Sequence, residues 1–330
     1  MAEKIINDAI HGSFRVDGVR KELLQTPEFN KLSHIKQLGL AHLVFPGAHH
    51  TRFEHSLGVS HVGGMMADSV GLDEEEKCLV QVAGMLHDVG HGPYSHTLEH
   101  ILHENGGMDH MSVTEGIIMG DHDVLRQGEE SVFAKRMLVP DILENYDIDP
   151  KRVSDLIRGP DASGSERSLF WSEGEDNFSG EDHTLATLVH GPVDCDQTDY
   201  LLRDAHFTGV RHGIIDHRHL IHNLHRHAGS VAIDESGIPA LEGMLTARAL
   251  MYSAVYFHRV TRITEVMLSS AVERMDVDDY DPLDMQRMVD AEIWQVLDQQ
   301  GDYQRDIIRR IKYRQMFKVA MTRRRSDLDE

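Results

Sequence analysis

The chain has 330 residues, and its 55 acidic and 33 basic side chains give a formal net charge of −22 at pH 7. An acidic surface repels nucleic-acid backbones and anionic membranes, so we expect neither stable binding to genomic DNA nor a membrane-bound protein. The sequence contains only two cysteines, Cys78 and Cys195, and no run of the roughly 18 apolar residues that a membrane span needs. We therefore expect a cytoplasmic protein without a disulfide framework.

Apolar residues recur at helical spacing through most of the chain. Val59, Val62 and Met66 form one such series, and Leu79 and Val82 belong to the next. A length of 330 residues suits one large or two ordinary domains. The sequence therefore predicts an all-α (mainly α-helical) fold with a minor β-hairpin, divided into a domain at 1–225 and a C-terminal helical region at 226–330.

Local signals predict where several elements begin and end. The glycines after His87-Asp88 predict that a helix ends there, and Asp149-Pro150 predicts the start of another helix. The segment 161–182 is rich in Gly, Ser and acidic residues, which predicts a solvated loop. We further expect a hairpin around 230–233 with its turn at 234–237, a long helix from Glu242 to Arg274, and a frayed charged tail at 323–330.

Histidines and carboxylates gather directly after the helix that ends at His87-Asp88. An isolated His-Asp pair is more often a helix cap beside a hydrogen-bonding carboxylate than a metal site. Here two further segments carry the same residue types, one containing His55 and the other Asp196. Burying unpaired charge is costly, and a divalent cation would compensate that cost. The three segments together favour a metal site.

The stretches Phe29–Val59, His87–His96 and Asp194–Asp204 resemble the HD-domain phosphohydrolases. Within them, the chain is similar to the deoxynucleoside triphosphate triphosphohydrolase branch, which includes dGTPase-like enzymes and the SAM-and-HD-domain enzymes. The similarity extends from about Asn7 to Arg262, and no SAM domain is expected ahead of it. The resemblance implies an HD-domain helical fold in the domain at 1–225, on which the C-terminal region packs, and a homo-oligomer.

The resemblance also implies a metal centre. His55, His87, Asp88 and Asp196 match the family's ligands for one divalent metal ion. This mixed nitrogen and oxygen set suits Mn, Fe, Zn, Ni or Mg, and ligand type alone does not choose among them. A further Mg could accompany the nucleotide.

The family's catalytic positions are also present. His96 matches the catalytic histidine, and an oriented imidazole is a suitable general acid because its pKa lies near the working pH. Glu99 stands where an acidic residue would orient His96, and His110 matches another active-site histidine. Arg52 matches the arginine near the α-phosphate; its alternative reading is a surface ion pair.

The resemblance implies a site for a nucleotide, with a dNTP favoured. Tyr256 matches a tyrosine that crowds the 2′ position, which would disfavour a ribonucleotide; a core aromatic is an equally simple reading. The matched substrate-binding positions, from the sugar wall to the outer phosphates, are Gln37, Leu38, Arg52, His91, Tyr200, Asp204, Arg248 and Tyr256.

The chain departs from the vertebrate pattern at several positions. Gln197 replaces a lysine near the phosphates, and Tyr252 replaces a histidine. In the regulatory pocket Lys4 and Asn7 match, whereas the residues that read a guanine activator are replaced by Gln25, Asn30 and Ser33. A nucleotide activator stays open, and guanine specificity is not implied.

We predict hydrolysis of a dNTP to deoxynucleoside and triphosphate by metal-assisted attack on the α-phosphate. Two alternatives remain. One is another HD phosphohydrolase activity, such as that of a nucleotidase or phosphodiesterase. The other is a non-catalytic nucleotide-binding sensor, which would bind a nucleotide without releasing a product.

Overall fold

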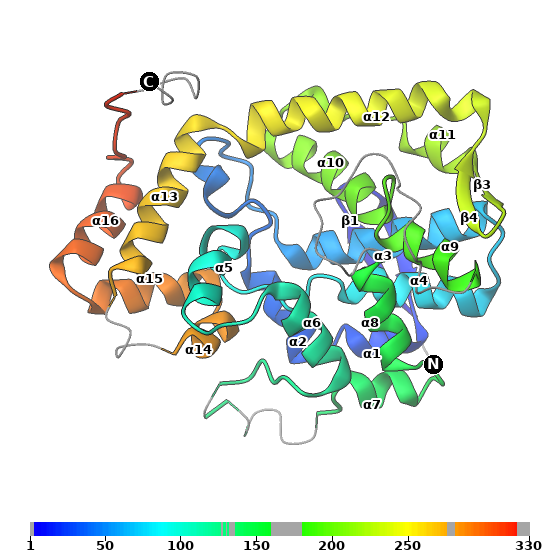
Figure 1. Cartoon of the computed structure of the whole chain (residues 1–330), viewed down its shortest axis with the longest axis horizontal. Coiled ribbons are helices and arrows are strands. Elements are labelled where there is room, and N and C mark those ends of the chain that lie inside the picture. Colours follow the sequence, from blue (N-terminus) through cyan, green and yellow to red (C-terminus); the bar gives the residue numbers. More distant parts are fainter. Residues whose placement is uncertain are drawn as a thin grey trace, which may run out of the picture.

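The computed structural model of the chain describes residues 3–126, 128–129, 131, 136–159, 180–275 and 281–321. Helices dominate these residues, and two small antiparallel hairpins accompany them, which confirms the predicted mainly α-helical fold (Figure 1). The α-helices are α1 Gly18–Leu23, α2 Pro27–Lys31, α3 Arg52–Ser69, α4 Glu74–Leu86, α5 Ser95–Glu104, α6 His110–Met119, α7 Val139–Glu144, α8 Pro150–Arg158, α9 Gly180–Val189, α10 Cys195–Thr208, α11 His217–His222, α12 Ile238–Met251, α13 Arg259–Glu273, α14 Pro282–Arg287, α15 Asp290–Gln299 and α16 Asp302–Lys312.

The strands form two separate hairpins, and short helical turns fill the connections. β1 Lys4–Asp8 pairs with β2 Gly12–Val16, and β3 Leu224–His227 pairs with β4 Ser230–Ile233. The 3₁₀ turns are η1 Leu32–His34, η2 Gly39–Leu43, η4 Arg211–Gly213 and η5 Glu235–Gly237, and η6 Tyr252–Tyr256 is a π-helical turn. None of the helices in the described part of the chain combines the length and the apolar character that crossing a bilayer requires.

Helix α3 packs against both α4 and α10, and these helices position the histidine and aspartate motifs found in the sequence. A capping box between Thr51 and Glu54 starts α3, and one between Asp73 and Glu76 starts α4. α4 ends at Leu86, so His87 caps the helix and the sequence prediction for this end is confirmed. The motif that follows α4 therefore begins at the buried end of this helix.

The C-terminal helices pack against α5. One apolar cluster joins Leu98 and Leu102 of α5 to Leu268 of α13, Ile293 of α15 and Ile307 of α16. In Figure 1 these C-terminal helices lie together at one end of the molecule, in yellow to red. The division at residue 225 remains a proposal, with the C-terminal region packing on the helix that carries His96.

Two predicted elements differ from the structure. The hairpin at 230–233 exists, but its turn is Ala228-Gly229, where φ is 50° and 81°. The segment 234–237 instead follows β4 as η5. The prediction was wrong because alanine is an unusual residue for the positive φ that a two-residue hairpin turn needs.

The predicted continuous helix from Glu242 to Arg274 is interrupted. α12 ends at Met251, the π turn η6 follows, and α13 begins only at Arg259. His258 caps α13 by accepting a hydrogen bond from the backbone N–H of Val260 at 3.3 Å, so the chain leaves the helical path there. Helical periodicity on both sides of a π turn conceals such a break.

Three further predictions concern other ends of elements. The start of a helix at Asp149-Pro150 is confirmed, because Asp149 caps α8 and Pro150 is its first residue. Of the predicted loop at 161–182, residues 161–179 lie outside the described residues, and 180–182 belong to α9. The tail at 323–330 also lies outside them.

Candidate metal centre and active site

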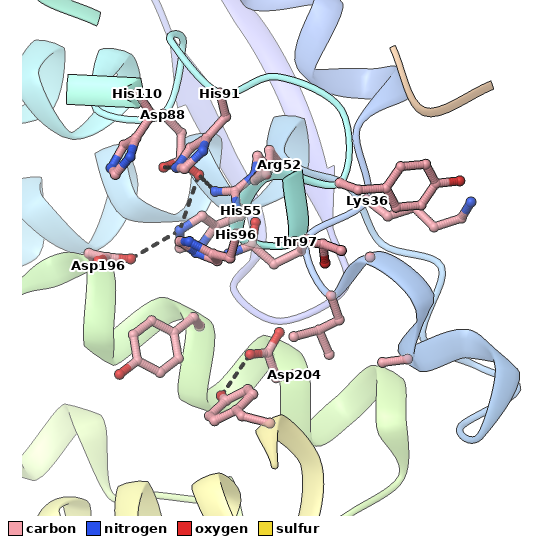
Figure 2. A pocket seen from close by; sticks show the side chains of 18 of the residues that line it. Lys36, Arg52, His55, Asp88, His91, His96, Thr97, His110, Asp196 and Asp204 are labelled. Atoms are coloured by element: carbon pink, nitrogen blue, oxygen red, sulfur yellow. Dashed lines mark hydrogen bonds and ion pairs between the residues drawn. The ribbon is translucent and has the colours of Figure 1, made fainter. Parts of the chain in front are cut away.

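Four side chains from three elements converge on one point. His55 comes from α3, Asp88 follows α4, and Asp196 comes from α10 (Figure 2). His87 directly precedes Asp88. The His55 Nε2 atom lies 3.1 Å from Asp196 Oδ1 and 4.0 Å from Asp88 Oδ2, and His87 Nε2 lies 3.2 Å from Asp88 Oδ1. Neighbouring ligands of one metal ion lie about 3 Å apart when metal–ligand bonds are about 2.1 Å. His55, His87 and Asp88 each offer a ligand atom, and these atoms lie within 4.8 Å of one another, which fits a single ion. Asp196 Oδ1 lies beside both imidazoles, at 3.1 Å from His55 Nε2 and 3.9 Å from His87 Nε2.

Hydrogen bonds at the other ring nitrogens orient both imidazoles. His55 Nδ1 lies 2.8 Å from Asp199 Oδ2, and His87 Nδ1 lies 2.9 Å from the carbonyl oxygen of Gly84. Each acceptor fixes the proton on Nδ1, which leaves the lone pair of Nε2 facing the carboxylates. This is the tautomer that a metal ion requires.

The carboxylates of the centre carry negative charge that a cation would balance. Burial alone would lower the pKa of His55, but Asp196 and Asp199 outweigh it and raise the pKa to about 10. The imidazole therefore attracts a positive charge at Nε2, which a proton or a divalent cation in its place would supply. Burial would raise the pKa of Asp88, but Arg52 and His87 hold that pKa well below its usual range. Two carboxylates thus stay ionised in a buried place beside two imidazoles. The residues present fit a divalent cation.

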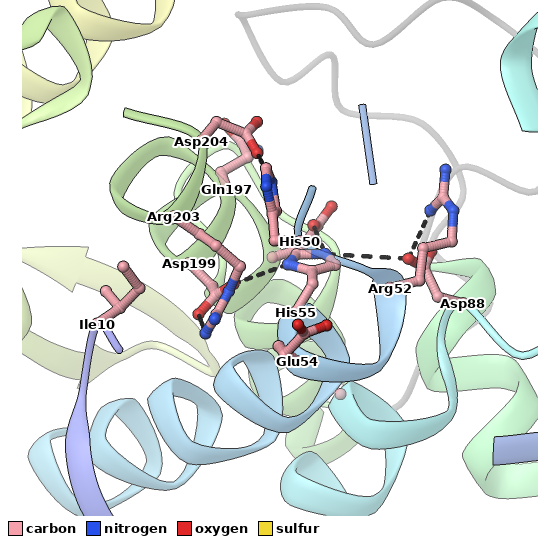
Figure 3. A network of polar contacts seen from close by, with 12 residues as sticks. Ile10, His50, Arg52, Glu54, His55, Asp88, Gln197, Asp199, Arg203 and Asp204 are labelled. Carbon is pink, nitrogen blue, oxygen red and sulfur yellow. Dashed lines mark hydrogen bonds and ion pairs between the residues drawn. The ribbon is translucent and has the colours of Figure 1, made fainter. Parts of the chain in front are cut away.

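Behind the centre lies a buried ionic network that sequence reasoning missed (Figure 3). Asp199 is fully buried and contacts His55, His11 Nε2 at 2.7 Å, and the Nε of Arg203 at 2.8 Å. Arg203, which is also fully buried, reaches Asp8 at 2.9 Å. Spacing could have revealed part of this network, because Asp199 lies one turn after Asp196 on the same helix and Arg203 lies one turn further.

Arg52 lies on the metal side of the cavity, as expected, but it is not a surface residue. Only 3% of it is exposed. Its guanidinium donates to Asp88 Oδ2 at 2.6 Å and to the hydroxyl of Ser95 at 3.1 Å. The surface ion pair that the sequence left open is therefore excluded for Arg52.

The histidines of the 91–110 segment lie together, but their carboxylate partner differs from expectation. Glu99 Oε1 lies 2.5 Å from His110 Nδ1, whereas Glu99 Oε2 lies 3.9 Å from His96 Nδ1. Glu99 therefore orients His110, which stacks on His91 with ring centroids 4.2 Å apart. The prediction that Glu99 orients His96 is wrong in this structure, because α6 brings His110 closer to the carboxylate.

His96 is open to water but faces the cavity. Its side chain is 74% exposed, and it lines the same cavity as the metal centre. Although most of its side chain is exposed, the protein atoms around the imidazole and then Arg52 and His110 lower the pKa of His96. These neighbours favour a neutral imidazole, whereas a bound anion would raise its pKa.

A cavity of about 770 Å³ opens from the metal centre toward α12 and η6. Asp204 lies in its wall, where it accepts hydrogen bonds from Tyr256 and His50, each at 2.7 Å. The other predicted substrate-binding residues also line this cavity: Gln37, Leu38, Arg52, His91, Tyr200 and Arg248. All eight positions, including Asp204 and Tyr256, therefore meet in one space, which also includes His110.

Two departures from the vertebrate pattern acquire a structural explanation. Gln197, which stands where the vertebrate pattern has a lysine, is buried and accepts a hydrogen bond from Arg248 at 2.9 Å. Gln197 therefore holds the side chain of Arg248 in place. In the regulatory region, the side chains of Gln25 and Asn30 donate to the backbone carbonyls of Lys21 and Leu24. Those amides stabilise the turn around α1 and α2.

Two family models match this chain: the HD domain over residues 52–133 and the HD associated region over residues 215–330. The uncharacterized protein YwfO of Bacillus subtilis (strain 168) is 34% identical over 278 residues, which are 82% of this chain and 56% of that protein. The deoxynucleoside triphosphate triphosphohydrolase SAMHD1 of Homo sapiens is 29% identical over 303 residues, 84% of this chain and 45% of that protein.

A crystal structure of a hypothetical protein from Aquifex aeolicus matches 99% of this chain and 80% of that chain, with 31% identity and a TM-score of 0.74. The chain spans about half the length of the curated relatives described above. The HD domain match includes Arg52, His55, His87 and Asp88, whereas Asp196 lies between the two matches. The proximity of Asp196 to the other three residues therefore comes from the structure, since neither family match includes it.

Proposed function

The chain belongs to the HD-domain family of hydrolases, and we propose that it is a metal-dependent phosphohydrolase that cleaves a dNTP to deoxynucleoside and inorganic triphosphate. One observation carries the proposal. The centre of His55, His87, Asp88 and Asp196 opens into a cavity whose walls include Arg52, Arg248 and Asp204. Cations for phosphates and an acceptor for a sugar hydroxyl suit a nucleotide.

The metal-side residues would act on the α-phosphate. A divalent ion held by the four ligands would neutralise phosphate charge and lower the pKa of a water molecule beside it. Arg52 is held in place by Asp88 and Ser95, so it presents its remaining N–H groups without a large entropic cost. In the proposed reaction it stabilises the charge that develops on the α-phosphate oxygens.

Two further groups would protonate the leaving group and select the sugar. His96 faces the cavity and donates a proton to the departing 5′-oxygen, because the nearby triphosphate raises the pKa of its imidazole. His50 and Tyr256 each donate to one oxygen of Asp204, and each oxygen keeps a second lone pair. The carboxylate can therefore also accept a hydrogen bond from a sugar hydroxyl. The ring of Tyr256 limits the space beside that sugar.

Substitution of the two key groups separates their roles. Asp196→Ala should lose bound metal and turnover together, whereas His96→Ala should keep metal and nucleotide binding while losing turnover. The matched control is His100→Ala, which removes an exposed imidazole from the same helix. Metal content, nucleotide affinity and hydrolysis of each dNTP and NTP would be measured with Mn or Mg, with nucleotide mixtures that supply any activator.

The outcomes also distinguish the alternatives. Orthophosphate or pyrophosphate as the product would indicate another HD activity, such as that of a nucleotidase or phosphodiesterase. Nucleotide binding without any product would indicate a sensor. Full turnover by a verified metal-free Asp196→Ala protein would refute the metal-dependent mechanism.

A further inference from the structure

One carboxylate of the C-terminal region reaches the walls of the active-site cavity. Asp290, the first residue of α15, is only 4% exposed. Its Oδ2 accepts a hydrogen bond from the backbone N–H of Lys36 at 3.0 Å, and its Oδ1 accepts one from the backbone N–H of Tyr94 at 2.9 Å. Lys36 and Tyr94 are far apart in sequence, and both line the active-site cavity.

A second residue of α15 holds the same tyrosine. Trp294, one turn after Asp290, donates its indole N–H to the hydroxyl of Tyr94. Tyr94 has φ 47° and ψ 25°, a left-handed conformation that is uncommon for a residue other than glycine. Such a conformation persists when its surroundings hold it, and here α15 holds both the backbone and the side chain of Tyr94.

The two anchored segments both lead to Arg52. Lys36 pairs with Thr51 in an isolated bridge, and the Arg52 N–H donates to the carbonyl oxygen of Ile35 at 2.9 Å. On the other side, the residue after Tyr94 is Ser95, whose hydroxyl accepts from the Arg52 guanidinium. His96 follows immediately. A shift of either segment would therefore displace Arg52, and a shift of the second would also displace His96.

α14 anchors the other end of the same histidine-bearing segment. Gln286, which is buried, accepts a hydrogen bond from the Met108 N–H at 3.1 Å and donates to the Met108 carbonyl oxygen. Met108 lies two residues before His110. The C-terminal region thus holds the segment from Tyr94 to Met108 at both ends.

A simpler role for Asp290 would be to stabilise the N-terminus of its own helix, where acidic residues are favourable. Its two oxygens instead accept N–H groups from two other segments. Burial raises the pKa of Asp290, and these two N–H groups oppose that effect first, followed by Lys36 and Arg52. A buried carboxylate is a costly way to stabilise a helix end, and its contacts point toward the cavity.

We propose that Asp290 is a positioning residue, which holds Arg52 and His96 in their working geometry through the backbones of Lys36 and Tyr94. This inference rests on the proposed phosphohydrolase function. None of the four metal ligands contacts Asp290, since His55 and Asp196 lie on α3 and α10 and His87 and Asp88 follow α4. Only Asp88 is linked to this arrangement, through its ion pair with Arg52, so the ligand set itself stays complete without Asp290. The C-terminal region thereby controls catalysis without contributing the metal site.

The test uses Asp290→Asn in the full chain, because asparagine keeps the shape but turns an N–H donor toward one of the two backbone N–H groups. Asp298→Asn is the matched control, since Asp298 is exposed on the same helix. The measurements are hydrogen exchange of the amides at 36 and 94, metal content, affinity for inorganic triphosphate, and kcat and KM for dNTP hydrolysis. We expect faster exchange at both amides, unchanged metal content, and a loss of kcat of about 10- to 100-fold.

Asp290→Asn with unchanged exchange, or with faster exchange but wild-type kcat and wild-type triphosphate affinity, would overturn the inference. A wild-type protein that binds triphosphate but hydrolyses no nucleotide would refute the proposed function alone. In that case a weaker affinity of the Asp290→Asn protein for triphosphate would still support positioning of Arg52. If Asp290→Asn does not fold, Trp294→Phe replaces it, with a smaller loss of kcat expected because only the Tyr94 hydroxyl loses its donor.

Discussion

Asp199→Asn should weaken the metal centre although Asp199 is not one of the proposed ligands. The substitution removes the charge that faces His55 Nδ1, so the tautomer with a free Nε2 lone pair loses its stabilising partner. Loss of such an outer partner typically costs 10- to 100-fold in metal affinity, or about 1.4–2.7 kcal/mol. The Arg203 guanidinium would also lose an ionic partner in a fully buried place, which costs about 3 kcal/mol of folding stability.

A matched pair on the surface provides the control. Asp306 and Arg310 have the same i,i+4 spacing as Asp199 and Arg203, with side chains 55% and 41% exposed. Asp306→Asn should change stability by no more than about 0.5 kcal/mol. Metal affinity would be measured by competition with a chelator, and stability by urea unfolding of the metal-free proteins. Wild-type metal affinity in Asp199→Asn would refute the argument that Asp199 sets the tautomer of His55.

Three more substitutions, the first with a control, test other parts of the structure. Gly58→Ala should lower the free energy of unfolding by several kcal/mol, because an added Cβ would collide with the side chains of Asp199 and Arg203. The control Gly243→Ala, where the added Cβ meets open space, should raise the stability by about 0.5–1 kcal/mol. Equal melting temperatures of the two variants would contradict this reasoning. Tyr256→Ala should raise the NTP-to-dNTP ratio of kcat/KM about tenfold, and an unchanged ratio would show that the ring does not select the sugar.

The third substitution, Glu99→Gln, has an effect that depends on pH. Burial would raise the pKa of Glu99, but the hydrogen bonds and charge of His110 outweigh it and lower the pKa to about 2. A depressed carboxyl pKa stabilises the fold above the unfolded pKa of about 4.3, and this stabilisation is lost as the pH falls toward 2. Urea unfolding should therefore show a larger loss of stability at pH 7 than at pH 3, and equal losses would contradict the pairing.

The helical fold could be predicted from the sequence because it depends on local patterns, whereas the four ligand positions came from the resemblance to the HD-domain phosphohydrolases. Periodicity identified α3 and α4, and the glycines after Asp88 marked the end of α4 correctly. The structure brings His55, His87 and Asp196 together because the helices that carry them pack against one another. The spacing of the motifs in the sequence does not by itself predict this proximity.

The features that were missed depend on contacts between distant segments. No local pattern around Glu99 predicts that the packing of α6 brings His110 closer to Glu99 than His96 is. The partners of Asp290 lie more than 190 residues away, so no local pattern could indicate them. The π turn at η6 was missed for a different reason, since residues on both sides keep helical periodicity.

Hydrolysis in ¹⁸O-labelled water tests the central claim most directly. The purified protein, loaded with Mn, would be incubated with a dNTP. The products would be separated, and their ¹⁸O content would be measured by mass spectrometry. Attack on the α-phosphorus predicts one ¹⁸O atom in the released inorganic triphosphate and none in the deoxynucleoside. Label in orthophosphate or in the deoxynucleoside, or no product with any nucleotide, would contradict the account.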